Sequence, residues 1–190
     1  MKYNFRYTLN FSISFRIIVS FILLFSLTGK LLADVCVWRN PERTMVLIFP
    51  QARDYKTLDR KISSEKEAEI EKLLGKPLDP GERENWSHYE IVGSNGKVLG
   101  YIIADAEKGE YGVIEIVMGI TPDGKVKQVY IQRERERDKE FKSKEFLNQF
   151  VDKTKDDPIQ IGKDIKGRSL PAEQVALAVN KMLIMFYELH

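Results

Sequence analysis

Alternating apolar and polar positions in the middle of the chain predict two β-hairpins. Residues 86–92 and 97–105 flank the sequence Gly-Ser-Asn-Gly, and residues 110–120 and 125–133 flank Thr-Pro-Asp-Gly. Successive side chains of a strand point to opposite faces, and tight turns favour Gly, Pro, Asn and Asp, so both patterns are typical of hairpins. One face of the third predicted strand carries Ile114, Ile116, Met118 and Ile120. We therefore expect an antiparallel sheet with an apolar face to be covered.

Helical spacing after the strands predicts the elements that cover this face. Residues 171–188 carry apolar side chains at spacings of three and one, which is typical of a buried helix face. These side chains are Val175, Ala178, Val179, Met182, Leu183 and Phe186. A shorter stripe predicts a second helix and consists of Phe146, Leu147, Phe150 and Val151.

One more helix is predicted before the strands. Ser64 and Glu67 have the spacing of a capping box, and Gly75 is a suitable residue to end the helix. The inner face of this helix is predicted to carry Ile70, Leu73 and Leu74.

The other upstream segments follow from apolar runs and turn residues. The run MVLIFP (45–50) stops at Pro50 and is predicted to be a short strand, and residues 76–84, with two prolines and a glycine, a loop. The predicted fold class is therefore α+β, a single domain with an antiparallel sheet packed under helices.

An N-terminal signal or anchor segment is predicted to precede this domain. The run 17–29 has no charged residue, and the first acidic residue is Asp34. The run is shorter than the roughly 20 residues that span a membrane but suits a signal-peptide core, with Ala33 at the cleavage point. An uncleaved membrane anchor is the alternative. We expect a periplasmic or other extracytoplasmic protein, attached to the inner membrane if the anchor is retained.

The predicted organisation has three parts: a signal peptide or anchor (1–33), an N-terminal extension with one helix (34–84) and the main domain (85–190). The chain has 30 basic and 28 acidic residues, and four of the basic ones lie in the leader, which leaves 26 against 28. Because this balance is slightly acidic, we expect no nucleic-acid partner.

The sequence offers neither an internal disulfide nor a recognisable metal site. Cys36 is the only cysteine. The two histidines, His88 and His190, are far apart and lack companion ligands at metal-binding spacings. We therefore expect no bound metal.

The order of the segments resembles the FMN-binding domain family over roughly residues 85–189. The similar segments are KGEYGVIEIVMGITPDGKVKQVYIQ, KEFLNQFVDKT, DPIQIGKDI and the final apolar helix. This family includes periplasmic flavin subunits of sodium-pumping and Rnf-type electron-transport complexes, and regulators attached to respiratory reductases. The resemblance implies a similar fold and a similar place beside a membrane complex.

In that family, the final helix follows a turn with the signature Ser-Gly-Ala-Thr-x-Ser-Ser, whose Thr carries FMN through a phosphoester. Alignment on the final helix places Ser169 at this Thr and puts Lys166, Gly167 and Arg168 at the preceding Ser, Gly and Ala. The family's Glu-Thr-Pro segment is replaced by Glu-Arg-Glu at 134–136. The chain thus departs from the family at both signatures.

The resemblance implies an FMN site at the N-terminus of the final helix. Free backbone N–H groups favour a phosphate there, and Lys166 and Arg168 add positive charge. The Ser169 hydroxyl permits a phosphoester, but it is also a typical helix cap. Three alternatives follow for the site formed by Lys166, Gly167, Arg168 and Ser169: reversible FMN, covalent FMN or no flavin.

The implied function is an exported FMN-binding electron-transfer protein associated with a membrane redox or respiratory complex. No catalytic acid, base or nucleophile is evident, so we expect a carrier or complex subunit rather than a stand-alone enzyme. Trp86, Tyr101 and Tyr111 are candidates for packing against a flavin ring. The alternative is a flavin-less binding or assembly module, indicated by the two altered signatures and by the charged run 133–145. This run is predicted to be a solvated loop and helix start.

Overall fold

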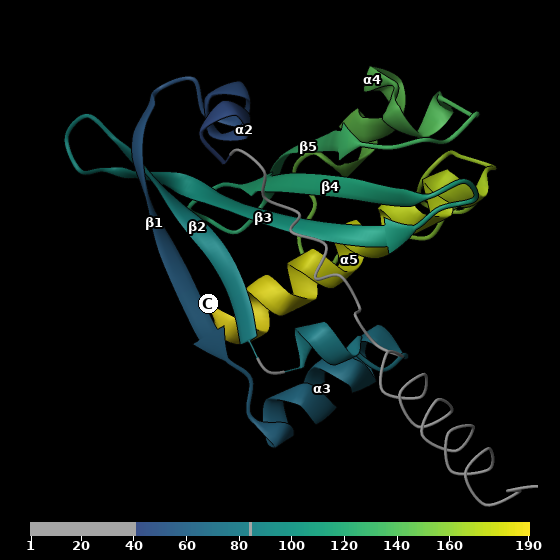
Figure 1. The fold of residues 1–190 in the computed structure, drawn as a ribbon, viewed down its shortest axis with the longest axis horizontal. Helices are drawn as coiled ribbons and strands as arrows, with labels where there is room; N and C mark the ends of the chain where they lie inside the picture. The colour runs from purple at the N-terminus through teal and green to yellow at the C-terminus, as the bar shows by residue number, and fades with distance from the viewer. Residues whose placement is uncertain (1–40, 84) are drawn as a thin grey trace, which may run out of the picture. The chain divides into compact units, whose positions relative to one another are not determined.

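An antiparallel sheet of five strands organises the part of the chain that the computed structural model describes, residues 41–83 and 85–190 (Figure 1). The strands follow one another across the sheet in chain order. They are β1 (Ala52–Lys61), β2 (Asn85–Gly93), β3 (Val98–Lys108), β4 (Val113–Ile120) and β5 (Val126–Arg133). Because helices pack on this sheet, the predicted α+β class is confirmed, and so are the hairpins β2–β3 and β4–β5.

Strand β1 is not among the predicted strands, and its position explains why. Six of the ten side chains in its sequence, ARDYKTLDRK, are charged, and it lies at an edge of the described sheet beside β2. An edge strand buries little apolar area, so no apolar alternation marks it in the sequence. Its pairing with β2 includes an ion pair in which Lys56 Nζ lies 2.9 Å from Glu90 Oε1.

The strand predicted for MVLIFP is wrong, because these residues end a helix, α2 (Pro41–Ile48). Met45 and Ile48 are buried, whereas Val46 and Leu47 between them are 52% and 49% exposed. This spacing is helical, and a proline at the first position suits a helix start because its fixed φ matches the first turn. A short run of apolar residues does not distinguish a strand from a helix by periodicity alone.

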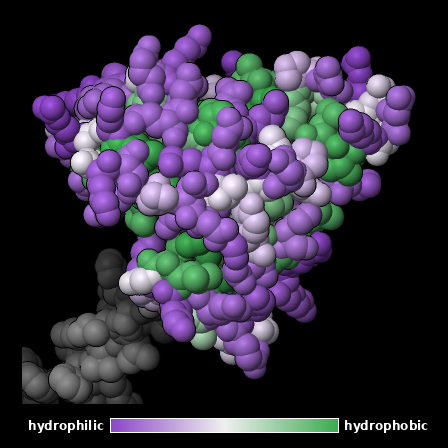
Figure 2. All heavy atoms as spheres, turned by 180° about the vertical axis from the view of Figure 1, so that it is seen from behind, coloured by the Kyte–Doolittle hydropathy of each residue, from purple (hydrophilic) through white to green (hydrophobic). Residues whose placement is uncertain are grey.

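The two faces of the sheet carry separate apolar clusters. On one face, Ile48 and Phe49 from the end of α2 pack in a cluster with Val117 of β4. The helix α5 (Leu170–Leu189) crosses the other face, and Figure 1 shows it running behind β3. The predicted inner face of α5 is confirmed, since its members are all buried: Val175, Ala178, Val179, Met182, Leu183 and Phe186. Seen from behind, the surface is largely hydrophilic, with apolar side chains in separate patches (Figure 2).

The helix predicted before the strands is present as α3 (Ser64–Leu74), which packs against α5. Its cap is Ser63, one residue before the predicted position. Gly75 ends the helix with a φ of +68°, a conformation that glycine adopts without steric cost. Ile70 is buried as predicted, but Leu73 is 52% exposed, so its predicted inward position is wrong.

The helix predicted from the stripe around residue 147 is short. It consists of α4 (Lys144–Leu147) and a 3-10 turn (Asn148–Phe150). Phe146 and Phe150 are buried, whereas Val151 is 37% exposed because the helix has ended before it. The predictions for residues 1–33 and for Cys36 fall outside the described residues. Within the described part of the chain, no helix is long and apolar enough to cross a membrane.

A buried ionic cluster joins α5 to β3 and to the 3-10 turn Pro80–Glu82. Lys181 of α5 is 3% exposed, and its Nζ lies 2.7 Å from Glu82 Oε1, 3.0 Å from Asp105 Oδ1 and 3.0 Å from Glu107 Oε1. Burial raises the pKa of Asp105 to about 6, although the nearby ammonium group opposes this shift. Three carboxylates therefore share one buried cation.

The two histidines meet in the fold, which corrects the expectation that they lie apart. His88 Nε2 and His190 Nδ1 are 3.1 Å apart. His88 is fully buried and stacks on Trp86, with ring centroids 4.4 Å apart. Among the described residues, no group of three or more side chains is arranged to hold a metal ion.

This arrangement predicts a pH dependence of stability. Burial, followed by the proximity of His190, lowers the pKa of His88 from 6.5 to about 4. The unfolded chain therefore binds more protons between these two values. We expect His88 by itself to make the free energy of unfolding fall as the pH is lowered from about 6.5 to about 4, by at most about 1.4 kcal/mol per pH unit. The raised pKa of Asp105 acts in the opposite direction over part of this range, but it is common to the wild type and to His88→Gln. Urea titrations should therefore show that the free energy of unfolding of the wild type minus that of the variant decreases as the pH is lowered, and a constant difference would contradict the assignment.

Candidate functional site

The predicted site residues lie in the turn that leads into α5. Ser169 caps the helix: its Oγ accepts a hydrogen bond from the Ala172 N–H at 3.4 Å, and its carbonyl accepts one from the Glu173 N–H at 3.1 Å. Leu170 and Pro171 form the start of the first helical turn, where a proline is favourable because the N–H that it lacks would have no acceptor within the helix. The capping role considered from the sequence is present, and the attachment of flavin to Ser169 stays a prediction.

The preceding helix α4 and the 3-10 turn after it hold this turn in place. Gln149 Oε1 accepts a hydrogen bond from the Lys166 N–H at 2.7 Å, and Gln149 Nε2 donates one to the Lys166 carbonyl at 3.0 Å. Gly167 packs closely on Phe146, since an added Cβ would lie 3.0 Å from the ring. The side chains of Lys166 and Arg168 are exposed. The turn is therefore fixed, while its two cations face solvent.

A surface pocket of about 310 Å³ lies beside this turn. It is lined by Glu140, Ser143, Glu145, Phe146, Gln149 and Lys166. Two carboxylates face one ammonium group here, so the pocket does not present the excess of positive charge that favours a phosphate.

A carboxylate of the chain itself lies at the N-terminus of α5. Asp138 accepts a hydrogen bond from the Glu140 N–H at 2.9 Å, and the Ser169 side chain lies beside its carboxylate. The hydrogen bond and then the nearby Ser169 side chain lower the pKa of Asp138, so the group is negatively charged at neutral pH. A negative charge is favourable at this end of a helix. Asp138 thus supplies an anion at the helix end where the resemblance implies the phosphate of FMN.

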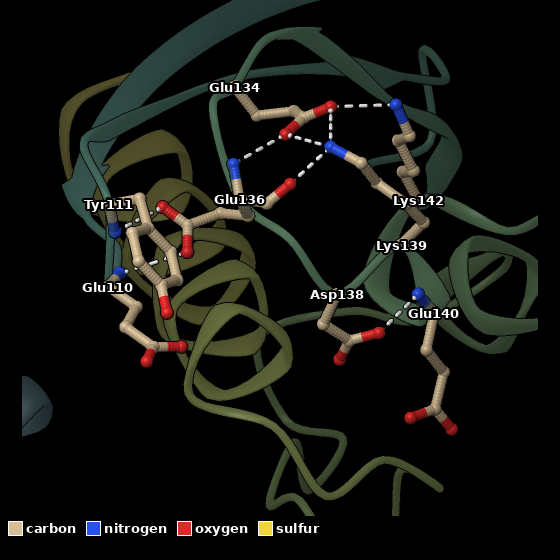
Figure 3. Close-up of polar contacts among 8 residues, drawn as sticks. All are labelled: Glu110, Tyr111, Glu134, Glu136, Asp138, Lys139, Glu140 and Lys142. Carbon is tan, nitrogen blue, oxygen red and sulfur yellow. Dashed lines mark hydrogen bonds and ion pairs between the residues drawn. The ribbon is translucent and has the colours of Figure 1, made fainter.

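A second carboxylate of the same segment is buried at the tip of the β3–β4 hairpin. Glu136 is 2% exposed, and it accepts hydrogen bonds from the N–H groups of Glu110 and Tyr111, each at 3.0 Å. Figure 3 shows the Glu136 carboxylate pointing towards these two backbone groups. Gly109 makes room for it, because an added Cβ there would overlap the carboxylate. The segment that replaces Glu-Thr-Pro is therefore anchored to the hairpin.

A third carboxylate, Glu134, stabilises the segment from within. Its oxygens accept hydrogen bonds from Lys139 Nζ at 2.8 Å, from Lys142 Nζ at 2.7 Å and from the Glu136 N–H at 2.7 Å (Figure 3). Burial would raise the pKa of Glu134, but these hydrogen bonds outweigh it and lower the pKa to about 2. The prediction that the run 133–145 is a solvated loop and helix start is therefore wrong for Glu134 and Glu136, whereas Glu140 and Glu145 are exposed and a helix starts at Lys144.

The aromatic candidates for a flavin contact divide into two groups. Trp86 is buried, and Tyr101 packs on Phe186 with ring centroids 5.2 Å apart, so both belong to the core. Tyr111 is 43% exposed, and the Arg137 guanidinium lies 4.6 Å from its ring centroid. Of these three, only Tyr111 lies beside residues 134–138, which we call the acidic segment.

The sequence prediction of the site missed Glu136 and Asp138. A signal for them exists, because the charges from residue 133 to residue 139 alternate strictly in sign. Alternation with a period of two in an extended segment places one sign on each side of the backbone.

No protein-family model matches the chain, and no curated protein matches it significantly.

Proposed function

We propose that this protein is an exported binding module that assembles with a membrane redox or respiratory complex and carries no flavin of its own. The observation that carries the proposal is the Asp138 carboxylate, which lies beside Ser169 at the N-terminus of α5. A phosphate placed at the same helix end would face this negative charge at close range, and like charges repel. This helix end therefore obtains both its cap, Ser169, and its negative charge, Asp138, from the chain itself rather than from a bound ligand.

Two further observations support the same function. The Ser169 oxygen already accepts a hydrogen bond from the Ala172 N–H and lies beside the negatively charged Asp138, an environment that disfavours a phosphoryl group on this hydroxyl. Glu140 and Glu145 line the adjacent pocket and add negative charge. Export is inferred from the leader, and the membrane complex from the family resemblance.

Titration with FMN tests this function. We expect the purified wild type to be colourless, with no flavin mass and no measurable FMN affinity. Asp138→Ser removes the competing charge and should raise the affinity for inorganic phosphate about tenfold, corresponding to about 1 kcal/mol or slightly more for a unit charge near a surface. The matched control is Asp123→Ser, which makes the same change in net charge in the β4–β5 turn.

Calorimetry and absorbance spectra of the three proteins decide the outcome. A yellow wild type, or FMN binding that Asp138→Ser does not strengthen, would contradict the proposal. An equal gain in phosphate affinity in both variants would show that net charge alone is responsible.

A reversible FMN carrier is the second candidate, and a specific observation favours it. The N–H groups of Gly167 and Arg168 have no acceptor in the described part of the chain, and the side chains of Lys166 and Arg168 are exposed beside them. If the wild type binds FMN, Lys166→Ala with Arg168→Ala should weaken binding by about 1–3 kcal/mol. If the yellow colour of the flavin survives denaturation of the wild type and is absent from Ser169→Ala, FMN is covalently attached to Ser169.

A further inference from the structure

The alternating charges of the acidic segment are sorted between the inside and the outside of the protein. Glu134, Glu136 and Asp138 all accept hydrogen bonds from neighbouring parts of the chain. The arginines between them, Arg135 and Arg137, are exposed. Neither arginine makes an ion pair with another described residue. Because the carboxylates are already engaged, they do not pair with the arginines, and the outer side of the segment is positively charged.

A third arginine lies at the same end of the molecule. The Asp138 carboxylate lies beside Ser169, which is adjacent in the chain to the exposed Arg168. On the other side, Arg135 lies against the β3–β4 hairpin, where an added Cβ on Gly112 would be 3.7 Å from the Arg135 Cβ. The hairpin tip, the acidic segment and the start of α5 therefore form one continuous region with cations on its outside.

Exposed apolar side chains accompany these cations. Tyr111 at the hairpin tip is 43% exposed and Leu170 at the start of α5 is 44% exposed. The Arg137 guanidinium covers one part of the Tyr111 ring at 4.6 Å, which fixes both side chains. We call the set Arg135, Arg137, Arg168, Tyr111 and Leu170 the arginine face.

We propose that the arginine face binds an acidic polypeptide segment that carries an apolar side chain. Guanidinium groups bind carboxylates through two parallel hydrogen bonds, and Arg and Tyr are the residues that most often dominate binding energy at protein interfaces. The charge complementarity selects the partner, while Tyr111 and Leu170 supply the apolar contact. The proposal rests on the proposed function, because it locates the surface through which the module meets its complex.

The rest of the described surface shows why this set stands out. Some lysines elsewhere are paired with carboxylates, as in Lys66 with Glu188 at 2.8 Å. Others, such as Lys61 and Lys97, are exposed without an ion pair to a described residue, so the arginine face is distinguished by its exposed Tyr111 and Leu170. Near the arginines, Glu134, Glu136 and Asp138 accept hydrogen bonds from other groups of the chain, whereas Glu110 at the hairpin tip is exposed beside Tyr111. Unpaired cations gathered beside exposed apolar groups are typical of a binding surface rather than of a solvated one.

The test uses the full chain in uncharged detergent and a fluorescein-labelled peptide of repeated Glu-Glu-Leu. We expect binding by fluorescence anisotropy that weakens with salt, as for an electrostatically steered interface. Arg135→Gln, Arg137→Gln and Arg168→Gln together should weaken it about tenfold or more, from roughly 0.5–1 kcal/mol per exposed charge pair. The matched control, Arg53→Gln, Lys61→Gln and Lys97→Gln, removes the same charge from other exposed positions and should leave the affinity within about twofold of wild type.

Several results would overturn the inference. Absence of peptide binding by the wild type would do so, as would equal losses in the two triple variants. If a soluble short-chain phosphatidylglycerol binds more tightly than the peptide through the same arginines, the face is a lipid-headgroup site instead. Leu170→Ser should weaken the Glu-Glu-Leu peptide but not a Glu-Glu-Ser peptide, and equal effects would remove the apolar part of the proposal.

The two proposals fail separately. A wild type that binds FMN and also binds the peptide through its arginines contradicts only the flavin-less function. A flavin-free wild type that does not bind the peptide contradicts only the arginine face.

Discussion

Replacing Lys181 by methionine is expected to destabilise the domain by about 3–5 kcal/mol, the range for removing one partner of a buried ion pair. Methionine has nearly the same volume, so the loss comes from charge rather than from packing. Glu82, Asp105 and Glu107 would then share a buried site without the cation that lies within 3.0 Å of each. Because Glu82 belongs to a different element from the other two carboxylates, the loop before β2 should loosen as well.

Urea denaturation followed by circular dichroism measures this effect, and two variants make it specific. Lys155→Met removes a partly exposed lysine from its ion pair with Glu188 and should cost less than about 1 kcal/mol. Adding Asp105→Asn to Lys181→Met should recover a large part of the lost stability, because Asp105 is the carboxylate left without a cation, whereas Lys76 Nζ still lies 3.6 Å from Glu107 Oε1. If Lys181→Met by itself is as stable as Lys155→Met, water reaches the carboxylates around Lys181.

Replacing Met182 by aspartate should unfold the domain or leave it barely stable. Met182 is 2% exposed on the face of α5 that packs against the sheet. An unpaired carboxylate buried there costs several kcal/mol, a large part of the roughly 5–15 kcal/mol that stabilises a domain. Thermal melting of the variant should show a weak transition or none.

The matched control for this change is Asn180→Asp on the same helix. Asn180 is partly exposed, and the substitution is nearly isosteric, so we expect a change within about 0.5 kcal/mol. If Met182→Asp melts close to the wild type, α5 does not bury this face and the arrangement of helix and sheet is incorrect.

The elements that the sequence predicts correctly are those with long, strict periodicity. The hairpins β2–β3 and β4–β5 and the helix α5 each have an apolar set with a period of two or of about 3.6. β1 carries no such set, because an edge strand is mostly solvated, and α2 is too short for its period to be distinguished from a strand. Helical spacing alone predicts an inward position for Leu73, whereas the packing of α3 on α5 decides which side of α3 is covered.

The site could be predicted only in part, for a physical reason. The cap at Ser169 follows from local sequence, since a cap binds a backbone group three residues away. The roles of Glu136 and Asp138 depend on contacts with the β3–β4 hairpin and with α5, about 25 and 30 residues away in the chain. Sign alternation in the sequence indicates that two sides exist but does not reveal which side faces inward.

The order of the strands has a consequence for the speed of folding. Each strand pairs with the strand that precedes or follows it in the chain, and the longest connection within the sheet is the one that contains α3. Closing short loops costs little chain entropy, and domains dominated by local pairing fold quickly. If the chain is exported N-terminus first, the strands can pair in the order in which they emerge. The apolar face of β3 and β4 would stay uncovered until α5, the last described element, emerges, so this face would be the one exposed to other unfolded chains during export.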